Sequence, residues 1–446
     1  MWESLRRHRG IVALWVIAGG ALVAIWWSQR DEVADPDLGA AEAPLRTHTD
    51  RSPDRAARAP RRATIPRAGA PTMFRLDARR SGQSPFRAPP RVVRKWRYEA
   101  GARITAQPVL ASDGTVLVGG HDGFFYAVRE AELVWRKQLG GPVYSTALLS
   151  RDGATLYVGC DADRFFALDV RTGAIRWTLR TEGDADTSAV LRADGTLLFG
   201  AGTDLWAVRA RDGHVVWRFR ARDKIYASPA LDGDDTIYFG SQDDYFYALD
   251  RDGRMRWSFK TQDDNDASPA VGDDGTVYFG SDDEHVYALS PEGERRWATD
   301  LDGYVRAALA LGRDGSVIAT TLGPRPRVVA LDPTTGEQRW SFSTELTQSR
   351  DLGILSAPTI GADGTVYVGA QDDYLYALDG GRLRWVQPLG GDVDSAPVIG
   401  PDGTLYVGSD DRGIWAFGAA PDLEATVDET DDAGSTDGGA SLADMA

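Results

Sequence analysis

The residues best suited to chemistry in this 446-residue chain are aspartates and tyrosines that recur at one position of a repeat of about forty residues. That position directly precedes a small-residue phrase such as Ala227-Ser228-Pro229-Ala230. In successive repeats it holds Thr105, Tyr144, Asp186, Tyr226, Asp266, Arg306, Leu355 and Asp394. Grouped carboxylates bind basic side chains, or calcium if about six to eight oxygens converge. The three aspartates, with Tyr144 and Tyr226, are therefore a candidate site for a basic segment of a partner or for calcium.

A second interpretation of these acidic residues stays open. Aspartates form turns, and a negatively charged loop surface keeps a protein soluble without any ligand. Further aspartates fall in the predicted hairpins on the same face: Asp122, Asp161, Asp163, Asp243, Asp244, Asp282, Asp283, Asp372, Asp373, Asp410 and Asp411. Arg306 could pair with one aspartate or hold a carboxylate of a ligand.

No catalytic residue is predicted. The repeats contain only three histidines, His121, His214 and His285, in different units and without metal-ligand spacing. The single cysteine, Cys160, ends an apolar strand with no cation beside it, which predicts a small buried filler. The sequence has no nucleophile elbow, phosphate loop or zinc pair. Whether the protein is an enzyme stays uncertain, and the residues favour binding.

The elements that position the ring residues come from the repeat itself. Between consecutive tryptophans the small-residue phrase, a turn with a strand (Asp274 to Gly280) and an apolar strand (Tyr245 to Asp250) recur in order. With the tryptophan strand this makes four strands in about forty residues, the size of one propeller blade. The repeat tryptophans, expected to dock blade against blade, are Trp96, Trp135, Trp177, Trp217, Trp257, Trp297, Trp340 and Trp385.

The order of the phrases predicts how the ring closes. Eight copies of each inner strand follow Trp96, but no tryptophan strand follows Phe417. The strand around Trp96 should therefore be the outer strand of the last blade, which removes open ends from the ring. We predict an all-β, eight-bladed propeller over residues 73–418. The blade-to-blade crossings and the second-to-third strand hairpins lie on one face, so the recurring position should ring the mouth of the central channel.

The phrases resemble the PQQ-like (quinoprotein-type) propeller repeat over residues 96–417. The residues that carry the resemblance are Asp363 to Gly369, Tyr374 to Asp379 and Trp385, and the lead-in from Met73 to Gly82 resembles the usual start of such propellers. Relatives include quinone-dependent alcohol dehydrogenases, sensor ectodomains of kinases and the propeller lipoprotein of the outer-membrane β-barrel assembly machine. In this family the repeat tryptophans are structural.

The resemblance also implies what a quinone enzyme would need. Its dehydrogenases typically carry an adjacent cysteine pair over the cofactor and Glu, Asn and Asp around calcium. This chain has one cysteine and no long inserted loops. We therefore expect no cofactor, and keep a PQQ- or calcium-dependent dehydrogenase as the alternative function.

The N-terminal residues predict export, and both ends of the chain differ in composition from the repeats. Residues 10–27 are uncharged and about long enough to cross a membrane. Three arginines within residues 1–9 precede this run and four acids soon follow it, which orients the N-terminus to the cytoplasm. Residues 28–72 read as a disordered Ala/Pro/Arg-rich linker, and residues 419–446 as a disordered acidic tail. The propeller would then lie on the periplasmic side of the inner membrane in a Gram-negative cell.

The net charge of −16 excludes a nucleic-acid partner, because phosphate binding needs a basic face. The expected function is a membrane-anchored scaffold that binds a protein or peptide, with a basic partner as one candidate, in envelope assembly or sensing.

Overall fold

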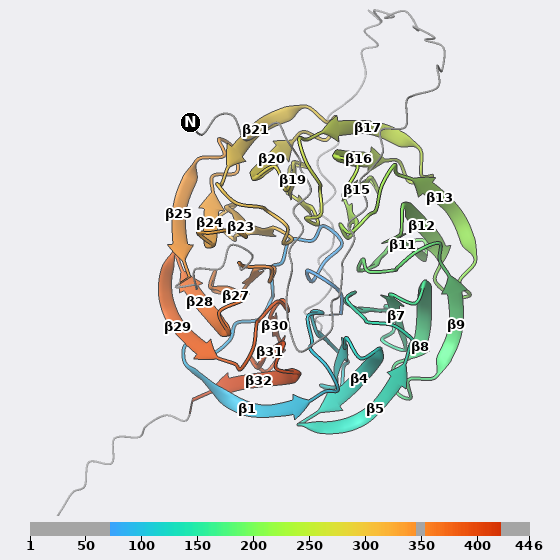
Figure 1. Ribbon diagram of the computed structural model, residues 1–446, viewed down its shortest axis with the longest axis vertical. Coiled ribbons are helices and arrows are strands. Elements are labelled where there is room, and N and C mark those ends of the chain that lie inside the picture. Colours follow the sequence, from blue (N-terminus) through green and yellow to red (C-terminus); the bar gives the residue numbers. More distant parts are fainter. Residues whose placement is uncertain (1–71, 345–352, 421–446) are drawn as a thin grey trace, which may run out of the picture. The chain divides into compact units, whose positions relative to one another are not determined.

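The computed structural model describes residues 72–344 and 353–420, and these residues form strands and loops without a helix. The strands build eight four-stranded antiparallel sheets, the blades of a ring (Figure 1). Seven blades take four consecutive strands, from β2–β5 to β26–β29, and the eighth joins β30, β31 and β32 to β1. The predicted eight-bladed all-β propeller is confirmed.

The strands take four places in their blades. The innermost are β2 (Val109–Leu110), β6 (Leu148–Leu149), β10 (Val190–Leu191), β14 (Ala230–Leu231), β18 (Ala270–Val271), β22 (Ala310–Leu311), β26 (Thr359–Ile360) and β30 (Val398–Ile399). The second are β3 (Val116–Gly119), β7 (Thr155–Cys160), β11 (Thr196–Ala201), β15 (Ile237–Gly240), β19 (Val277–Gly280), β23 (Val317–Thr320), β27 (Val366–Gly369) and β31 (Leu405–Gly408). The third are β4 (Phe124–Arg129), β8 (Arg164–Asp169), β12 (Asp204–Arg209), β16 (Tyr245–Leu249), β20 (His285–Leu289), β24 (Arg327–Leu331), β28 (Tyr374–Asp379) and β32 (Gly413–Ala419). The outermost are β1 (Val92–Glu99), β5 (Glu132–Gln138), β9 (Ile175–Arg180), β13 (Val215–Arg220), β17 (Met255–Lys260), β21 (Arg295–Asp300), β25 (Gln338–Ser343) and β29 (Arg382–Pro388).

The ring closes through the pairing of β1 with β32, as the order of the phrases predicts. The two strands run antiparallel from Val92 opposite Ala419 to Glu99 opposite Gly413, with one irregularity between Arg94 and Trp96. The ends of the described propeller are thus hydrogen-bonded into one blade, which leaves no blade with a missing outer strand.

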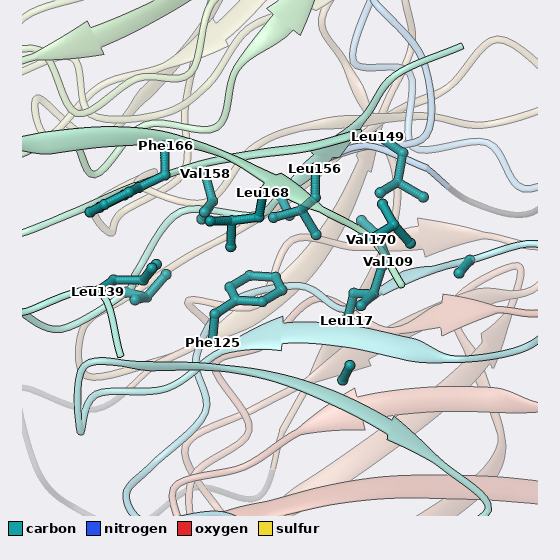
Figure 2. Packing of buried hydrophobic residues seen from close by; sticks show 14 of the residues in the cluster. Val109, Leu117, Phe125, Leu139, Leu149, Leu156, Val158, Phe166, Leu168 and Val170 are labelled. Atoms are coloured by element: carbon teal, nitrogen blue, oxygen red, sulfur yellow. The ribbon is translucent and has the colours of Figure 1, made fainter. Parts of the chain in front are cut away.

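The core lies between neighbouring blades. Figure 2 shows one such cluster, in which Phe125 of the first blade packs with Leu156 and Phe166 of the second. Because each blade is covered on both faces, the second and third strands are apolar on both sides, unlike a sheet with one wet face. Aromatic rings also stack between blades, with centroids 3.8 Å apart for Phe165 and Phe199.

The eight repeat tryptophans all lie on outermost strands. Four donate their indole N–H to a backbone carbonyl of the next blade, for example Trp257 to Pro291 at 2.9 Å. Five face a turn glycine of the next blade so closely that a Cβ would collide with the ring; at Gly253 it would lie 2.6 Å from Trp217.

A segment outside the repeat, residues 72–86, crosses the middle of the ring (blue in Figure 1), and we call it the plug. Innermost strands of five blades donate backbone N–H groups to plug carbonyls; the donors are Leu149, Leu231, Val271, Leu311 and Ile360. The guanidinium of Arg80 reaches the carbonyls of Ser188 and Pro229 at 2.8 and 3.1 Å. The plug therefore ties six blades together at the base of the channel.

No helix of the described residues is long and apolar enough to cross a membrane. The predicted membrane helix at 10–27, the rest of residues 1–71, and residues 421–446 of the predicted tail lie outside the described part of the chain.

Candidate functional site

The predicted ring residues are positioned by glycines at the ends of second strands. In seven blades a buried residue from the crossing packs on such a glycine: a Cβ added at Gly280 would lie 2.2 Å from Cγ1 of Val305. The buried anchor directly precedes the ring residue, as Val305 precedes Arg306. Because the anchor fills the gap between blades, its neighbour lies at the channel.

All eight predicted ring residues line one cavity in the channel, of about 200 Å³. A wider recess beside it, about 420 Å³, is lined by Tyr144, Asp161, Asp184, Asp186 and Tyr226. The structure thus brings the predicted ring residues together with the predicted hairpin residue Asp161, and adds Asp184 from a crossing. The side chains of Tyr144 and Tyr226 remain 40% and 38% exposed, so their rings are open to a ligand.

The ring aspartates are hard to ionise because they are partly buried beside other acids. Burial, then the charge of Asp282, raises the pKa of Asp266 to about 6. Burial, then Asp410, raises the pKa of Asp394 to about 7. Burial and Asp161 also raise the pKa of Asp186. One carboxylate oxygen of each ring aspartate is buried without a hydrogen-bond partner.

Arg306 is already engaged. Its Nε lies 2.9 Å from both carboxylate oxygens of Asp282, and its Nη2 lies 2.6 Å from Oδ2. The predicted pairing of Arg306 with an aspartate is therefore found, with a hairpin aspartate as the partner. The guanidinium also lies over the ring of Tyr304, 5.2 Å from its centroid.

Neighbours fix the two ring tyrosines. Tyr144 meets the imidazole of His121 edge-on at 4.4 Å, and His121 is held by Arg103 at 2.7 Å and Thr105 at 2.8 Å. Burial and Arg103 lower the pKa of His121 to about 4, so it is neutral at physiological pH. Lys224 places its ammonium 5.7 Å from the ring centroid of Tyr226. The site thus already holds one ammonium of this chain against an aromatic face.

Four of the eleven hairpin aspartates stabilise their own hairpins. Asp243 accepts the hydroxyl of Tyr247 at 2.7 Å and the backbone N–H of Tyr245 at 3.0 Å. The same arrangement recurs at Asp122, Asp283 and Asp372. For these residues the turn-forming interpretation is the right one. The spacing Asp-x-x-x-Tyr in the sequence is the signal that could have identified these structural aspartates.

The base of the channel cavity was not predicted. Phe74 of the plug lines it with Ala308, Ala357 and Ala396 on one side. On the other side backbone N–H groups bond the hydroxyls of the next blade, as Ser188 N does to Ser228 at 2.9 Å. The hydroxyl positions are Thr146, Ser188, Ser228 and Ser268.

Among the described residues, three carboxylates approach one another closely enough for a cation in three places; two of these include a ring aspartate, and the third is Asp244, Asp263 and Asp264. The oxygens of Asp161, Asp184 and Asp186 lie within 4.8 Å of one another, as do those of Asp264, Asp266 and Asp282. Calcium takes about six to eight oxygens, so each set would supply only part of a calcium shell.

The channel does not fit PQQ. PQQ is a tricarboxylate, whereas the mouth carries three carboxyl side chains in its ring and its arginine is bound to Asp282. The only cysteine, Cys160, is fully buried in the cluster between the first two blades, where burial raises its pKa. It therefore cannot form the cysteine pair of the quinone enzymes.

The comparisons with known proteins agree with this fold. The family model described as outer membrane protein assembly factor BamB matches residues 93–218, 180–303, 242–352 and 324–422. No curated protein matches the sequence significantly.

Solved structures of two functional kinds are similar. The BamB of Moraxella catarrhalis is 19% identical with a TM-score of 0.62, covering 74% of this chain and 100% of that one. A europium-containing methanol dehydrogenase is 13% identical with a TM-score of 0.66 (79% and 99%). The quinohemoprotein alcohol dehydrogenase of Comamonas testosteroni is 16% identical with a TM-score of 0.66 (80% and 82%). At these identities the likeness shows the fold alone.

Proposed function

This chain belongs to the PQQ-like repeat family whose model is described as outer membrane protein assembly factor BamB, and on that premise we propose that it is a protein-binding scaffold. The observation that carries the proposal is the acidic channel mouth, where Asp186, Asp266 and Asp394 meet two exposed tyrosines around one cavity. Aromatic rings and carboxylates together recognise lysine and arginine side chains. The partner therefore presents a basic segment.

Two features favour binding over quinone chemistry. The channel has no free cation in its ring to hold an anionic quinone, since Arg306 is paired with Asp282. Its base is lined by Phe74, alanines, Ser and Thr hydroxyls and Gln107, and none of these base residues is an acid, a histidine or a cysteine. The dehydrogenase alternative thus rests on similarity of fold.

The family description supports a role in assembling outer-membrane proteins, with a partner in that machinery. Such a role requires export, and we propose that residues 10–27 anchor the chain with the propeller outside the cytoplasm. Membrane fractionation and protease accessibility in intact and permeabilised cells test this placement. Recovery of the uncleaved chain in the soluble fraction would contradict it.

A charge-matched pair of triple variants tests the binding site. We expect the full chain to bind a lysine- and arginine-rich peptide in a calorimetric titration, and the variant with Asp186, Asp266 and Asp394 changed to Asn to bind it at least tenfold more weakly. The control changes Asp234, Asp252 and Asp379 to Asn, three exposed aspartates on the opposite face, two in turns and one at the end of β28. Equal losses in both variants would mean that net charge, and not the mouth, attracts the peptide.

A further inference from the structure

The channel cavity has an unpaired donor at its base. Gln107 lines the cavity and is 3% exposed, and its Oε1 accepts the backbone N–H of Arg75 at 3.3 Å. Its Nε2 is buried and has no hydrogen-bond partner. A buried amide N–H without a partner destabilises the folded protein, because it has lost its hydrogen bond to water. A ligand that accepts a hydrogen bond from Nε2 would remove this destabilisation.

The charges of the channel are arranged as a dipole. The rim carries the acids Asp186, Asp266 and Asp394, while the plug beneath carries Arg75 and Arg80, both fully buried. Burial lowers the pKa of Arg75 to about 9, which leaves its guanidinium positive at neutral pH. Nε and Nη1 of Arg75 also have no hydrogen-bond partner. Buried charges are screened little by salt, so the cavity floor lies in a positive field and its rim in a negative one.

The size and walls of the cavity restrict its ligand. About 200 Å³ is below the roughly 300–1,000 Å³ of sites for drug-sized ligands, so the ligand is small. One wall is apolar, from Ala308, Ala357 and Ala396, and suits a short hydrocarbon chain.

We propose that this cavity binds a small zwitterion, an amino acid or ω-amino carboxylate, with its ammonium among the rim aspartates and its carboxylate at Nε2 of Gln107. The orientation follows from the dipole, and the rim tyrosines add an aromatic face for the ammonium. The inference does not rest on the proposed protein partner, because the ligand lies inside the channel and needs no contact with the outer loops.

Three probes with six-carbon chains distinguish the contribution of the ammonium from that of the carboxylate. We expect 6-aminohexanoate to bind the full chain with one-to-one stoichiometry, at least tenfold more tightly than hexylamine, and hexanoate not to bind. Gln107→Leu should lower the affinity for 6-aminohexanoate about tenfold and leave that for hexylamine unchanged, since only the carboxylate uses Nε2. Gln338→Leu, an exposed glutamine of β25, is the matched control and should change neither.

The proposal is wrong if 6-aminohexanoate does not bind, if it binds no more tightly than hexylamine, or if Gln107→Leu leaves their ratio unchanged. Thermal unfolding checks that Gln107→Leu is folded. Should that variant not fold, Asp394→Asn decides: it must weaken both amines and keep their ratio, and equal binding to wild type would overturn the proposal.

Discussion

Arg306 and Asp282 form a bidentate pair across two blades, with the Nε of the guanidinium 2.9 Å from both carboxylate oxygens. Asp282 belongs to the hairpin of the fifth blade and is 5% exposed, whereas Arg306 enters the sixth. The pair neutralises a buried acid next to Asp266 and leaves the three ring aspartates outside this ion pair.

Removing Arg306 should destabilise the ring. Arg306→Ala leaves Asp282 buried and unpaired, and we expect a loss of about 1–3 kcal/mol in the free energy of unfolding, less than for a fully buried pair because Arg306 is partly exposed. The control is Arg325→Ala, whose pair with Asp302 is exposed at both ends and 3.5 Å long. It should cost under about 0.5 kcal/mol. Denaturant unfolding measures both, and equal losses would show that the buried pair has no special weight.

The contact of Trp217 with Gly253 gives a test of blade docking. Gly253→Ala adds a Cβ 2.6 Å from the indole at a φ of +81°, so backbone strain and a collision combine. We expect a loss of about 2–4 kcal/mol. Gly364→Ala is the control, because its φ is +83° and a Cβ there meets nothing within 4 Å. It should cost only about 1 kcal/mol. Similar melting temperatures for the two variants would show that the contact with Trp217 does not contribute to the loss.

The plug should stabilise the whole ring. Arg80→Met removes hydrogen bonds to the carbonyls of Ser188, Ala189 and Pro229 and leaves them buried, which we expect to cost about 3 kcal/mol or more. Arg79→Met is the neighbouring control, since the partner of Arg79 is the exposed Asp273. Thermal unfolding compares the two. Equal melting temperatures for the two variants would mean that the plug does not stabilise the ring.

Asp394 makes stability depend on pH. Its pKa is about 7 in the folded protein against an ordinary 3.8, so the folded state holds the proton longer. The stability from this group is full below about pH 4 and is lost as the pH rises through 7. Asp394→Asn cannot ionise and should exceed wild type by about 4 kcal/mol at pH 8, with little difference at pH 4. The exposed Asp252→Asn serves as control, and a constant difference across pH would contradict the assignment.

The repeat made the blades and the mouth predictable, because each position of the repeat recurs eight times in the same place of a four-stranded blade. The pairing of β1 with β32 was predictable for the same reason. The last repeat has no tryptophan strand after Phe417, so its outer strand had to be the extra tryptophan strand at Trp96. The ring of Tyr144, Asp186 and their equivalents followed from counting back from the small-residue phrase.

What the sequence did not predict lies outside the repeat or between blades. The plug has no second copy to align with, so nothing in the pattern shows that Arg75 and Arg80 enter the channel. The partner of Arg306 is a hairpin aspartate of the blade before it, and several aspartates at equal spacing competed for that place. The role of Gln107 was missed because a glutamine at the start of a blade carries no periodic signal.

In the proposed function, ionised carboxylates at the mouth bind a basic partner. The affinity of the full chain for a lysine- and arginine-rich peptide at pH 8 and pH 5.5 tests this binding. Asp266 and Asp394 have pKa values of about 6 and 7, beside Asp282 and Arg306 on one side and Asp392, Asp410 and Arg103 on the other. They are ionised at pH 8 and largely protonated at pH 5.5. We predict binding about tenfold tighter at pH 8, with this difference lost in Asp266→Asn/Asp394→Asn. Affinity that is unchanged between the two pH values, or a pH dependence that survives in the double variant, would contradict the claim.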